Sequence, residues 1–394
     1  MVENLIKYVC VSILFLLSIG GRCDGQSVQK SNSMEPFGDS MRHWYGIRDE
    51  HNDINPVKNQ PQYSHEEVAK IADNMLLYQR NNGGWPKNYD MQAILTTEQI
   101  ASLRASKTET NTTFDNSTTY SQIEYLAKAY SITKNKKYKT AVLKGLEFVL
   151  RAQYPNGGWP QYYPLEDGYS RRITYNDGAM IGILSLLKSI DNQEADFNFI
   201  PLEMRKQIHH AVEKGLECIL KTQIVSQNER TAWCQQHDEA TLLPAWARAF
   251  EPPAICNAES AAIVRFLMEI ENPTAEIIEA VQQAVKWFLH SRIYYTAVKT
   301  IDAPEEQTPQ RTIKTDRVVV IDSTAAPIWT RFYEIDSQRP MFSDRNSKIL
   351  YSLSEVSRER RAGYSWYTYA PQRIIDIYSK WAKNWNVESV IKAD

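Results

Sequence analysis

Two segments of the chain repeat one pattern, Gln-Arg-Asn-Asn-Gly-Gly-Trp-Pro at residues 79–86 and Gln-Tyr-Pro-Asn-Gly-Gly-Trp-Pro at residues 153–160. The two segments lie 74 residues apart, and a further 74 residues lead to Trp233. Amphipathic stretches such as 138–153 and 204–222 occupy the intervals. A glycine can end a helix in a sharp turn, and a unit of this length suits a pair of helices. The sequence therefore predicts a mainly α fold, an α/α toroid-like barrel built of repeated helical hairpins with few short strands.

The composition is that of a large globular protein. Of the 394 residues 43% are hydrophobic, and 10 Trp, 22 Tyr and 11 Phe exclude disorder throughout. The 45 basic and 47 acidic side chains give a formal net charge of −2, so we expect no nucleic-acid partner. Strand-like runs are scarce, and the clearest is Arg-Val-Val-Val-Ile at residues 317–321. The sequence has no coiled-coil seam, and we expect a monomer.

The start of the chain has the pattern of a signal peptide. The apolar run Tyr8–Ile19 is too short to cross ~30 Å of hydrocarbon as a helix but long enough for the core of a secretion signal. We expect a protein that is secreted or held in the periplasm or at the cell surface, with a lipid anchor at Cys23 as the alternative to a soluble form. No other apolar stretch reaches about 18 residues, so we expect no membrane span. The predicted division is a signal peptide at 1–23, a polar N-terminal arm or linker at 24–62, and one main domain at 63–394.

Three cysteines lie in the predicted main domain, namely Cys218, Cys234 and Cys256. An odd trio allows at most one disulfide and excludes a disulfide framework. Their spacing includes no Cys-x-x-Cys pair that would indicate zinc. Two interpretations stay open: buried free thiols, or a single bridge.

Acidic residues occur in two turn-like segments, each just before an apolar helical pattern. The first segment, 112–119, contains Asp115 and Asn116, and the second, 174–178, contains Asp177. Each aspartate could simply cap a helix. Two such loops in successive repeat units would, however, point to the same end of a toroid. Hard oxygen ligands that converge there suit calcium, which takes 6–8 oxygens and leaves room for those of a substrate.

A second candidate feature is a set of arginines interleaved with aromatic residues. Arg331 and Arg345 precede the aromatic run Tyr-Ser-Trp-Tyr-Thr-Tyr at 364–369, and Arg248 follows Trp246 by two positions. Arginine binds carboxylates through two parallel hydrogen bonds, and aromatic rings offer flat faces to sugars. Each arginine alone could form an ordinary surface ion pair. As a cluster they favour the binding of a polyanion.

The repeated tryptophans have two interpretations. The Gln-x-x-x-Gly-Gly-Trp pattern resembles the repeat of triterpene cyclases, in which it ties helices together, but the Asp-x-Asp-Asp proton donor of a cyclase does not occur in this sequence. The tryptophan could instead contact a substrate. We include Trp159 among the candidate substrate-binding residues.

Seven segments, in order along the chain, carry a resemblance to a known family. They are Asn-Gly-Gly-Trp-Pro-Lys-Asn (82–88), Thr-Phe-Asp-Asn-Ser-Thr-Thr (113–119), Asn-Gly-Gly-Trp-Pro-Gln-Tyr-Tyr-Pro (156–164), Thr-Tyr-Asn-Asp-Gly-Ala-Met (174–180), Trp-Cys-Gln-Gln-His (233–237), Pro-Ala-Trp-Ala-Arg-Ala-Phe-Glu-Pro-Pro (244–253) and Arg-Arg-Ala-Gly-Tyr-Ser-Trp-Tyr (360–367). Together they resemble family 10 of the polysaccharide lyases, the pectate lyases. The resemblance runs from about residue 64 to Trp385.

This resemblance implies an α/α toroid-like fold and calcium-dependent cleavage of polygalacturonate (pectate) by β-elimination. It implies that Asp115, Asn116 and Asp177 form the cluster that binds calcium (Ca²⁺) and the substrate carboxylate. It also implies an arginine as the catalytic base, best matched by Arg345. Arg248 and Arg331 match arginines that bind substrate carboxylates.

Two other functions stay open at this stage. An inverting glycoside hydrolase would need two carboxylic acids ~6.5–9.5 Å apart, a part that Asp115 and Asp177 could fill, although this leaves the arginines unexplained. A non-catalytic surface protein that binds acidic glycans would share the leader and the aromatic-rich site. The sequence favours the lyase.

Overall fold

The computed structural model describes residues 34–46 and 52–391. Its helices, with 3-10 turns labelled η, are η1 Glu35–Phe37, α1 Gly38–Gly46, α2 Val68–Tyr78, α3 Thr97–Ala105, η2 Ser106–Thr108, η3 Asp115–Ser117, α4 Tyr120–Thr133, α5 Lys136–Ala152, η4 Tyr169–Arg171, η5 Asn176–Gly178, α6 Ala179–Asp191, η6 Ala195–Phe197, α7 Leu202–Thr222, α8 Asn257–Met268, α9 Ala275–His290, η7 Leu353–Glu355, α10 Arg358–Gly363 and α11 Ala370–Asn384. Its strands are β1 Ile173–Thr174, β2 Val225–Ser226, β3 Glu229–Arg230, β4 Gln236–His237, β5 Ile255–Cys256, β6 Thr296–Gln307, β7 Thr312–Ile321, β8 Trp329–Thr330, β9 Phe332–Tyr333, β10 Pro340–Ser343, β11 Ile349–Leu350 and β12 Tyr367–Thr368.

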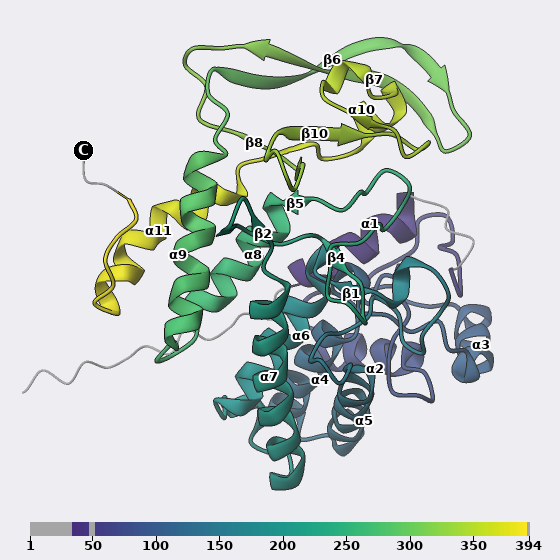
Figure 1. Ribbon diagram of the computed structural model, residues 1–394. Helices are drawn as coiled ribbons and strands as arrows, with labels where there is room; N and C mark the ends of the chain where they lie inside the picture. The colour runs from purple at the N-terminus through teal and green to yellow at the C-terminus, as the bar shows by residue number, and fades with distance from the viewer. Residues whose placement is uncertain (1–33, 47–51, 392–394) are drawn as a thin grey trace, which may run out of the picture.

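The long helices form two rows. In the outer row α2 contacts α5, α5 contacts α7, and α7 contacts α9. In the inner row α4 contacts α6, α6 contacts α8, and α8 contacts α11. Each outer helix is followed along the chain by a long loop and then by an inner helix (Figure 1). This is the predicted mainly α architecture of repeated helical hairpins, and it matches an α/α toroid.

A glutamine at the end of each of the first three outer helices, α2, α5 and α7, joins neighbouring units. The amide Nε2 of Gln153 donates to the carbonyl of Gly157 at 3.0 Å and to that of Ala211 in the next outer helix, α7, at 2.9 Å. Gln79 and Gln223 make the corresponding pairs of bonds in their own units. One side chain thus satisfies a carbonyl of its own turn and fixes the adjacent helix.

A tryptophan in each unit forms a hydrogen bond back to the preceding outer helix. The indole Nε1 of Trp159 donates to the carbonyl of Val149 in the last turns of α5, at 2.9 Å. Trp85, Trp233 and Trp329 bond in the same way to α2, α7 and α9 at 2.8 to 2.9 Å. All four indoles are fully buried. Trp329 therefore marks a fourth unit beyond the three that the repeat spacing indicates.

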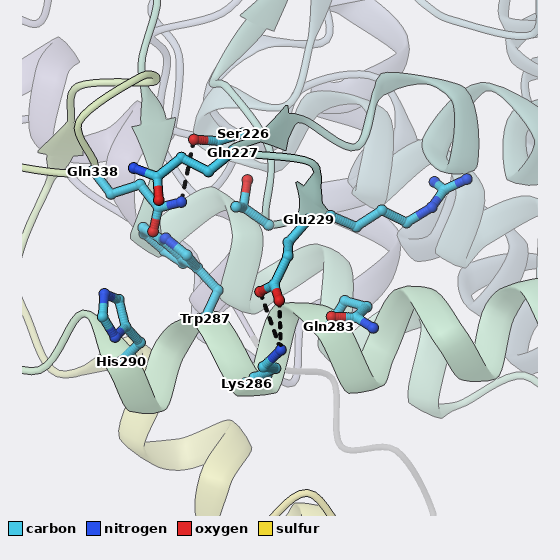
Figure 2. Close-up of a pocket in the computed structure, with 10 residues that line it drawn as sticks. Ser226, Gln227, Glu229, Gln283, Lys286, Trp287, His290 and Gln338 are labelled. Atoms are coloured by element: carbon cyan, nitrogen blue, oxygen red, sulfur yellow. Dashed lines mark hydrogen bonds and ion pairs between the residues drawn. The ribbon is translucent and has the colours of Figure 1, made fainter.

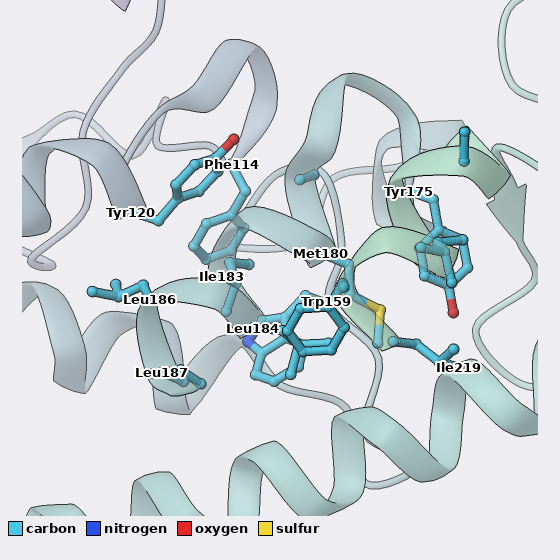
Figure 3. Close-up of a cluster of buried hydrophobic side chains, with 14 of the residues drawn as sticks. Phe114, Tyr120, Trp159, Tyr175, Met180, Ile183, Leu184, Leu186, Leu187 and Ile219 are labelled. Atoms are coloured by element: carbon cyan, nitrogen blue, oxygen red, sulfur yellow. The ribbon is translucent and has the colours of Figure 1, made fainter. Parts of the chain in front are cut away.

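The glycine pair of the motif is required by close packing. Gly157 has φ +93°, and a Cβ there would lie 1.9 Å from the carbonyl oxygen of Lys214 in α7. Gly83, with φ +103°, meets Lys144 in α5 in the same way, at 2.3 Å. A side chain would be disfavoured at either position both by the backbone conformation and by the neighbouring helix. Figure 3 shows Trp159 seated among the buried side chains of this region.

Part of the predicted N-terminal arm packs onto the domain. Met34, Phe37, Trp44 and Ile54 are buried in the same hydrophobic core as the helical rows. The Trp44 indole donates to the carbonyl of Ile54 at 2.8 Å. These segments therefore belong structurally to the domain. The predicted signal peptide and Cys23 lie outside the described residues.

The longest strands form a ribbon that stands apart from the helical rows. β6 and β7 pair in antiparallel register from Thr296–Ile321 to Gln307–Thr312, with an irregularity between Asp302 and Glu306. The strand predicted at 317–321 is thus confirmed as part of β7. Figure 1 shows the ribbon crossing above α10 and β10, and β7 contacts α10.

Two further sequence predictions concern the cysteines and the membrane. Cys218, Cys234 and Cys256 are buried and free, so the interpretation as unbridged thiols is the right one. Within the residues that the structure describes, no helix is long and apolar enough to cross a bilayer.

We expect Gln153→Ala to lower the free energy of unfolding by about 1–3 kcal/mol, because it leaves two carbonyls without their donor. Denaturant unfolding followed by circular dichroism would measure the change. Gln372→Ala, which removes an exposed contact with Asp376 inside α11, is the matched control and should change stability by less than about 0.5 kcal/mol. Equal effects of the two substitutions would contradict the role given to Gln153.

Candidate active site

Acidic residues gather where three consecutive inner helices begin. Asp115 lies in η3 before α4, Asp177 lies in η5 before α6, and Glu259 lies in the first turn of α8. The turns η3 and η5 contact each other, and η5 contacts α8. The repeat therefore brings the two predicted loops to one end of the fold. Sequence analysis missed Glu259 because the third unit lacks the glycine pair that marks the other two.

The backbone in these loops explains the residue types there. Asn116 has φ 50° and ψ 43°, and Asp177 has φ 50° and ψ 26°. Asn and Asp are the non-glycine residues that adopt this left-handed conformation most readily. In the described chain neither α4 nor α6 has a side-chain cap at its first turn. The aspartates are thus free of the capping role that the sequence left open.

Asp115 and Asp177 have contrasting electrostatic environments. Asp115 is buried, and although burial acts to raise its pKa, an ion pair with Lys87 at 2.7 Å holds that pKa below its usual value. Asp177 keeps access to solvent although protein surrounds it on most sides. The pKa of Asp177 is raised to about 7. Burial is the larger cause, and the negative charge of Asp115 is the next.

Arg331 ties the acidic loops to the C-terminal part of the chain. Its Nη2 donates to Oδ1 of Asn176 at 2.9 Å and to Oε1 of Glu259 at 2.7 Å. The guanidinium also lies 4.7 Å from the ring centre of Tyr364. Burial alone would lower the pKa of Arg331, but Glu259 raises it, so this arginine stays charged beside Asp177.

Arg248 lies near both aspartates. It is held by Glu251 through two hydrogen bonds, Nε to Oε2 at 2.7 Å and Nη2 to Oε1 at 2.5 Å, and Tyr364 donates to the same carboxylate at 2.8 Å. The side chain of Arg248 is 45% exposed, whereas that of Glu251 is 2% exposed. The charge of Arg248 acts to lower the pKa of Asp115 and of Asp177, so it is electrostatically coupled to the acidic loops.

Arg345 shares a glutamate with Arg360 and lies, like Arg248, close to the ring of Phe250. Its Nε donates to Oε2 of Glu359 at 2.9 Å, and Arg360 binds the same carboxylate at 2.8 and 2.9 Å. The guanidiniums of Arg248, Arg345 and Arg360 lie 5.0, 5.3 and 4.6 Å from the ring centre of Phe250. The three predicted arginines thus belong to one continuous cationic patch, in which each guanidinium is oriented by a glutamate that the sequence analysis did not single out.

The chemistry of the acidic loops fits a hard divalent cation. One oxygen of Asp115, Oδ1, is buried without a hydrogen-bond partner among the described residues. Carboxylate and amide oxygens are the ligands that calcium prefers, and a cation would relieve the repulsion between the two aspartates. Within residues 34–46 and 52–391 no three acidic, histidine or cysteine side chains form a complete metal cluster.

The comparisons with known proteins agree with this geometry. The chain matches the family model described as pectic acid lyase over residues 79–375. This chain belongs to the pectic acid lyase family. It is a polysaccharide lyase of family 10, as the sequence resemblance implied.

Two solved structures are similar to this lyase, both of the family 10 polysaccharide lyase from Cellvibrio cellulosa. One has 31% identity and a TM-score of 0.67, with 82% of this chain and 98% of that chain covered. The other, a mutant in complex with trigalacturonic acid, has 31% identity and a TM-score of 0.66, with 80% and 96% covered. No curated protein sequence matches the chain.

Trp159 requires a correction. Its side chain is completely buried in the lyase, and its indole N–H donates to the carbonyl of Val149. A substrate has no surface of this residue to contact, so the prediction of substrate binding is wrong for Trp159. The residue ties helices together, which is the alternative that the sequence analysis left open.

A buried histidine supports the loop that carries Asp177. His237 in β4 pairs with Ile173 in β1, the strand just before that loop. Its Nε2 accepts a hydrogen bond from the backbone of Cys234 at 3.2 Å, and its Nδ1 lies 2.9 Å from the carbonyl of Leu242. The ring is therefore neutral with the proton on Nδ1. Burial lowers the pKa of His237 to about 4.

We expect the lyase to lose stability as the pH falls from about 6.5 to about 4. The unfolded histidine binds a proton below about 6.5, whereas the folded one does not until about 4, so protons favour the unfolded chain by up to roughly 3 kcal/mol. Unfolding free energies of wild type and His237→Gln, measured at several pH values, would isolate this contribution. The variant should show a shallower pH slope, and exposed His65→Gln should keep the wild-type slope; parallel slopes for wild type and His237→Gln would refute the assignment.

Proposed function

We propose that this lyase is a secreted pectate lyase that cleaves polygalacturonate by calcium-assisted β-elimination and releases 4,5-unsaturated oligogalacturonates. The observation that carries the proposal is the acidic pair Asp115 and Asp177 facing a patch of arginines oriented by glutamates. The trigalacturonic acid bound to the Cellvibrio cellulosa relative supports the substrate. Family membership and the predicted signal peptide support secretion.

The arginine patch would bind the polyanionic substrate. A guanidinium fork matches a carboxylate through two parallel hydrogen bonds, and its orientation is fixed in advance where a glutamate holds its far side. Arg331 is 13% exposed, and its hydrogen bond fixes the side chain of Asn176, the residue that precedes Asp177. Arg345, which is 39% exposed, has nitrogen atoms available to a uronate. In this proposal both hold substrate carboxylates near the acidic loops.

Asp115, Asn116 and Asp177 would hold calcium together with carboxylate oxygens of the substrate. When bound, the cation would neutralise the uronate carboxylate and so stabilise the enolate-like charge that develops next to it. Lys87 keeps Asp115 ionised. Asp177 is the more accessible of the two and would give up its proton near neutral pH as a cation replaces it.

An arginine would serve as the base. The sequence resemblance assigns this role to Arg345, but Arg345 shares the carboxylate of Glu359 with Arg360. Arg248 is our candidate, because its side chain is 45% exposed and its charge acts on both aspartates. Although burial acts to lower the pKa of Arg248, Glu251 holds that pKa above its usual value, so the neutral form requires alkaline conditions. We therefore propose Arg248 as the base and Arg345 as a substrate-binding residue.

The proposed elimination requires a single base. A neutral guanidine nitrogen takes the proton from C5, the electron pair of that C–H bond forms the C4–C5 double bond, and the C4–O bond breaks. The departing oxygen takes a proton from water. Because an arginine pKa lies above ~12, the neutral form becomes more abundant as the pH rises, and activity should increase under alkaline conditions.

A second candidate function is an inverting glycoside hydrolase. The same two aspartates favour it. Asp177, with a pKa raised to about 7, could act as the general acid, and the ionised Asp115 could act as the general base. It gives no role to the arginine patch. A non-catalytic protein that binds acidic glycans remains the third alternative.

Incubation with polygalacturonate, with calcium or with excess chelator, separates these functions. We expect the ultraviolet absorbance of the unsaturated product to grow with calcium and to stop with chelator, because elimination creates a conjugated double bond. New reducing ends without that absorbance would identify a hydrolase. Binding without turnover at any pH from neutral to alkaline would identify a binding protein, and both results would contradict the lyase.

Replacement of the two arginines by lysine distinguishes their roles. We expect Arg248→Lys to lower kcat by about 10²–10⁴-fold with a smaller change in KM, as for loss of a positioned base. We expect Arg345→Lys mainly to raise KM. Kinetics on polygalacturonate across alkaline pH would measure both, with Arg265→Lys on the surface of α8 as the control. The opposite pattern would return the role of base to Arg345.

A further inference from the structure

Three arginines surround a single glutamate beside the proposed site. Arg345 binds the carboxylate of Glu359 through Nε at 2.9 Å and Nη2 at 3.2 Å. Arg360 binds it at 2.8 and 2.9 Å, and Nε of Arg311 lies 3.5 Å from Oε1. Because Arg311 and Arg345 reach the same carboxylate, their guanidiniums are neighbours. We refer to these four residues as the Glu359 cluster.

The Glu359 cluster carries a surplus of positive charge. Three guanidiniums surround one carboxylate. Burial lowers the pKa of Arg311, and the charges of Arg360, Arg345 and Arg317 lower it further against the opposing effect of Glu359. The nearby carboxylate of Asp344 is occupied by Ser357 and by the backbone of Arg345. Arg248 and Arg331, by contrast, each have a glutamate of their own. The surplus is therefore confined to this part of the cationic patch.

Arg311 comes from the tip of the ribbon formed by β6 and β7. A turn closed by hydrogen bonds between Thr308 and Arg311 directs the chain there. Its Nη2 donates to the backbone carbonyl of Glu359 at 2.6 Å, across the end of α10. A Cβ on Gly363 would lie 1.1 Å from the same Nη2, so the absence of a side chain at Gly363 makes the space for this guanidinium.

The ribbon is fixed in this position by other bonds. Arg317 in β7 donates to the carbonyl of Tyr364 at 2.7 Å, and Tyr364 in turn binds Glu251 at 2.8 Å. Asp316 forms an ion pair with Arg361 in α10 at 2.6 Å. Arg311 is thus not needed to attach the ribbon. Its side chain is nonetheless 39% exposed, the same fraction as that of Arg345, whereas that of Arg360 is 10% exposed.

We propose that Arg311 is a further substrate-binding residue, which holds the carboxylate of a uronate adjacent to the one held by Arg345, so that the ribbon forms a wall of the binding site. The proposal rests on the proposed function, since it assumes an extended polyuronate in the arginine patch. Two exposed guanidiniums that share one buried carboxylate keep unused donors, and a polymer with one carboxylate on every sugar supplies acceptors at regular intervals. The ribbon therefore contributes to the preference for long acidic chains.

The test compares Arg311→Gln, which removes the charge, with Arg311→Lys, which keeps it. We expect Arg311→Gln to raise KM for polygalacturonate by about three- to tenfold, with kcat within about twofold of wild type, because an exposed carboxylate contact contributes modestly. KM should also depend less on salt in this variant, while Arg311→Lys should recover most of the affinity. Lys314→Gln is the matched control, because Lys314 lies on the same ribbon and pairs with Glu305.

The outcomes separate this inference from the proposed function. An unchanged KM and salt dependence in Arg311→Gln would overturn it, and so would a lower melting temperature with unchanged KM, which would assign Arg311 a purely structural role. Gly363→Ala, which displaces the guanidinium without removing its charge, should raise KM in the same way. If wild type shows no elimination, the proposed function fails; calorimetric titration with trigalacturonic acid then still tests Arg311, and equal affinity of wild type and Arg311→Gln would overturn its role.

Discussion

The fold depends on the pair of hydrogen bonds that one glutamine makes at the end of each of the first three outer helices, α2, α5 and α7. Gln79, Gln153 and Gln223 each bond to a carbonyl in their own turn and to an alanine carbonyl in the next outer helix. A primary amide supplies two N–H donors, one for a carbonyl of the turn and one for a carbonyl within the neighbouring helix. The bonds therefore satisfy buried polar groups and set the spacing between units at the same time.

This constraint explains the position of the acidic loops. After every such turn the chain passes a buried tryptophan and then enters an inner helix from the same side, so Asp115, Asp177 and Glu259 arrive at one end of the fold. The arginines arrive differently, from irregular segments: Arg248 from a loop and Arg331 from the link between β8 and β9. The site is thus assembled from a repeated acidic half and a non-repeated basic half.

The sequence allowed the repeated half to be predicted better than the other. Regular spacing of Gln, Gly and Trp predicts units, and equal units place Asp115 and Asp177 on one face without knowledge of any distance. Trp159 was assigned to the substrate because periodicity reveals that a residue recurs but not whether it is buried. Glu259 was missed because the third unit lacks the glycine pair that marks the other two.

The glutamates behind the arginines were harder to predict. Glu251 follows Arg248 by three residues and could be taken for a local ion pair. Glu359, by contrast, meets Arg345 from 14 residues away and meets Arg311 only because the ribbon folds over α10. Long-range contacts of this kind depend on packing that no local pattern encodes.

The distribution of charge links the two halves. Asp115 has a lysine as its partner, while burial, and after it the like charge of Asp115, raises the pKa of Asp177 to about 7. On the basic side, Arg248 and Arg331 each have one glutamate, while the Glu359 cluster has more guanidiniums than carboxylates. In the protein alone, the negative charge at Asp177 is therefore poorly compensated. The positive charge of the Glu359 cluster is poorly compensated as well. A polyanion together with a divalent cation compensates both at once, because the cation reduces the repulsion at Asp177 while the polymer's carboxylates occupy the unused guanidinium donors. Binding of either component should therefore strengthen binding of the other.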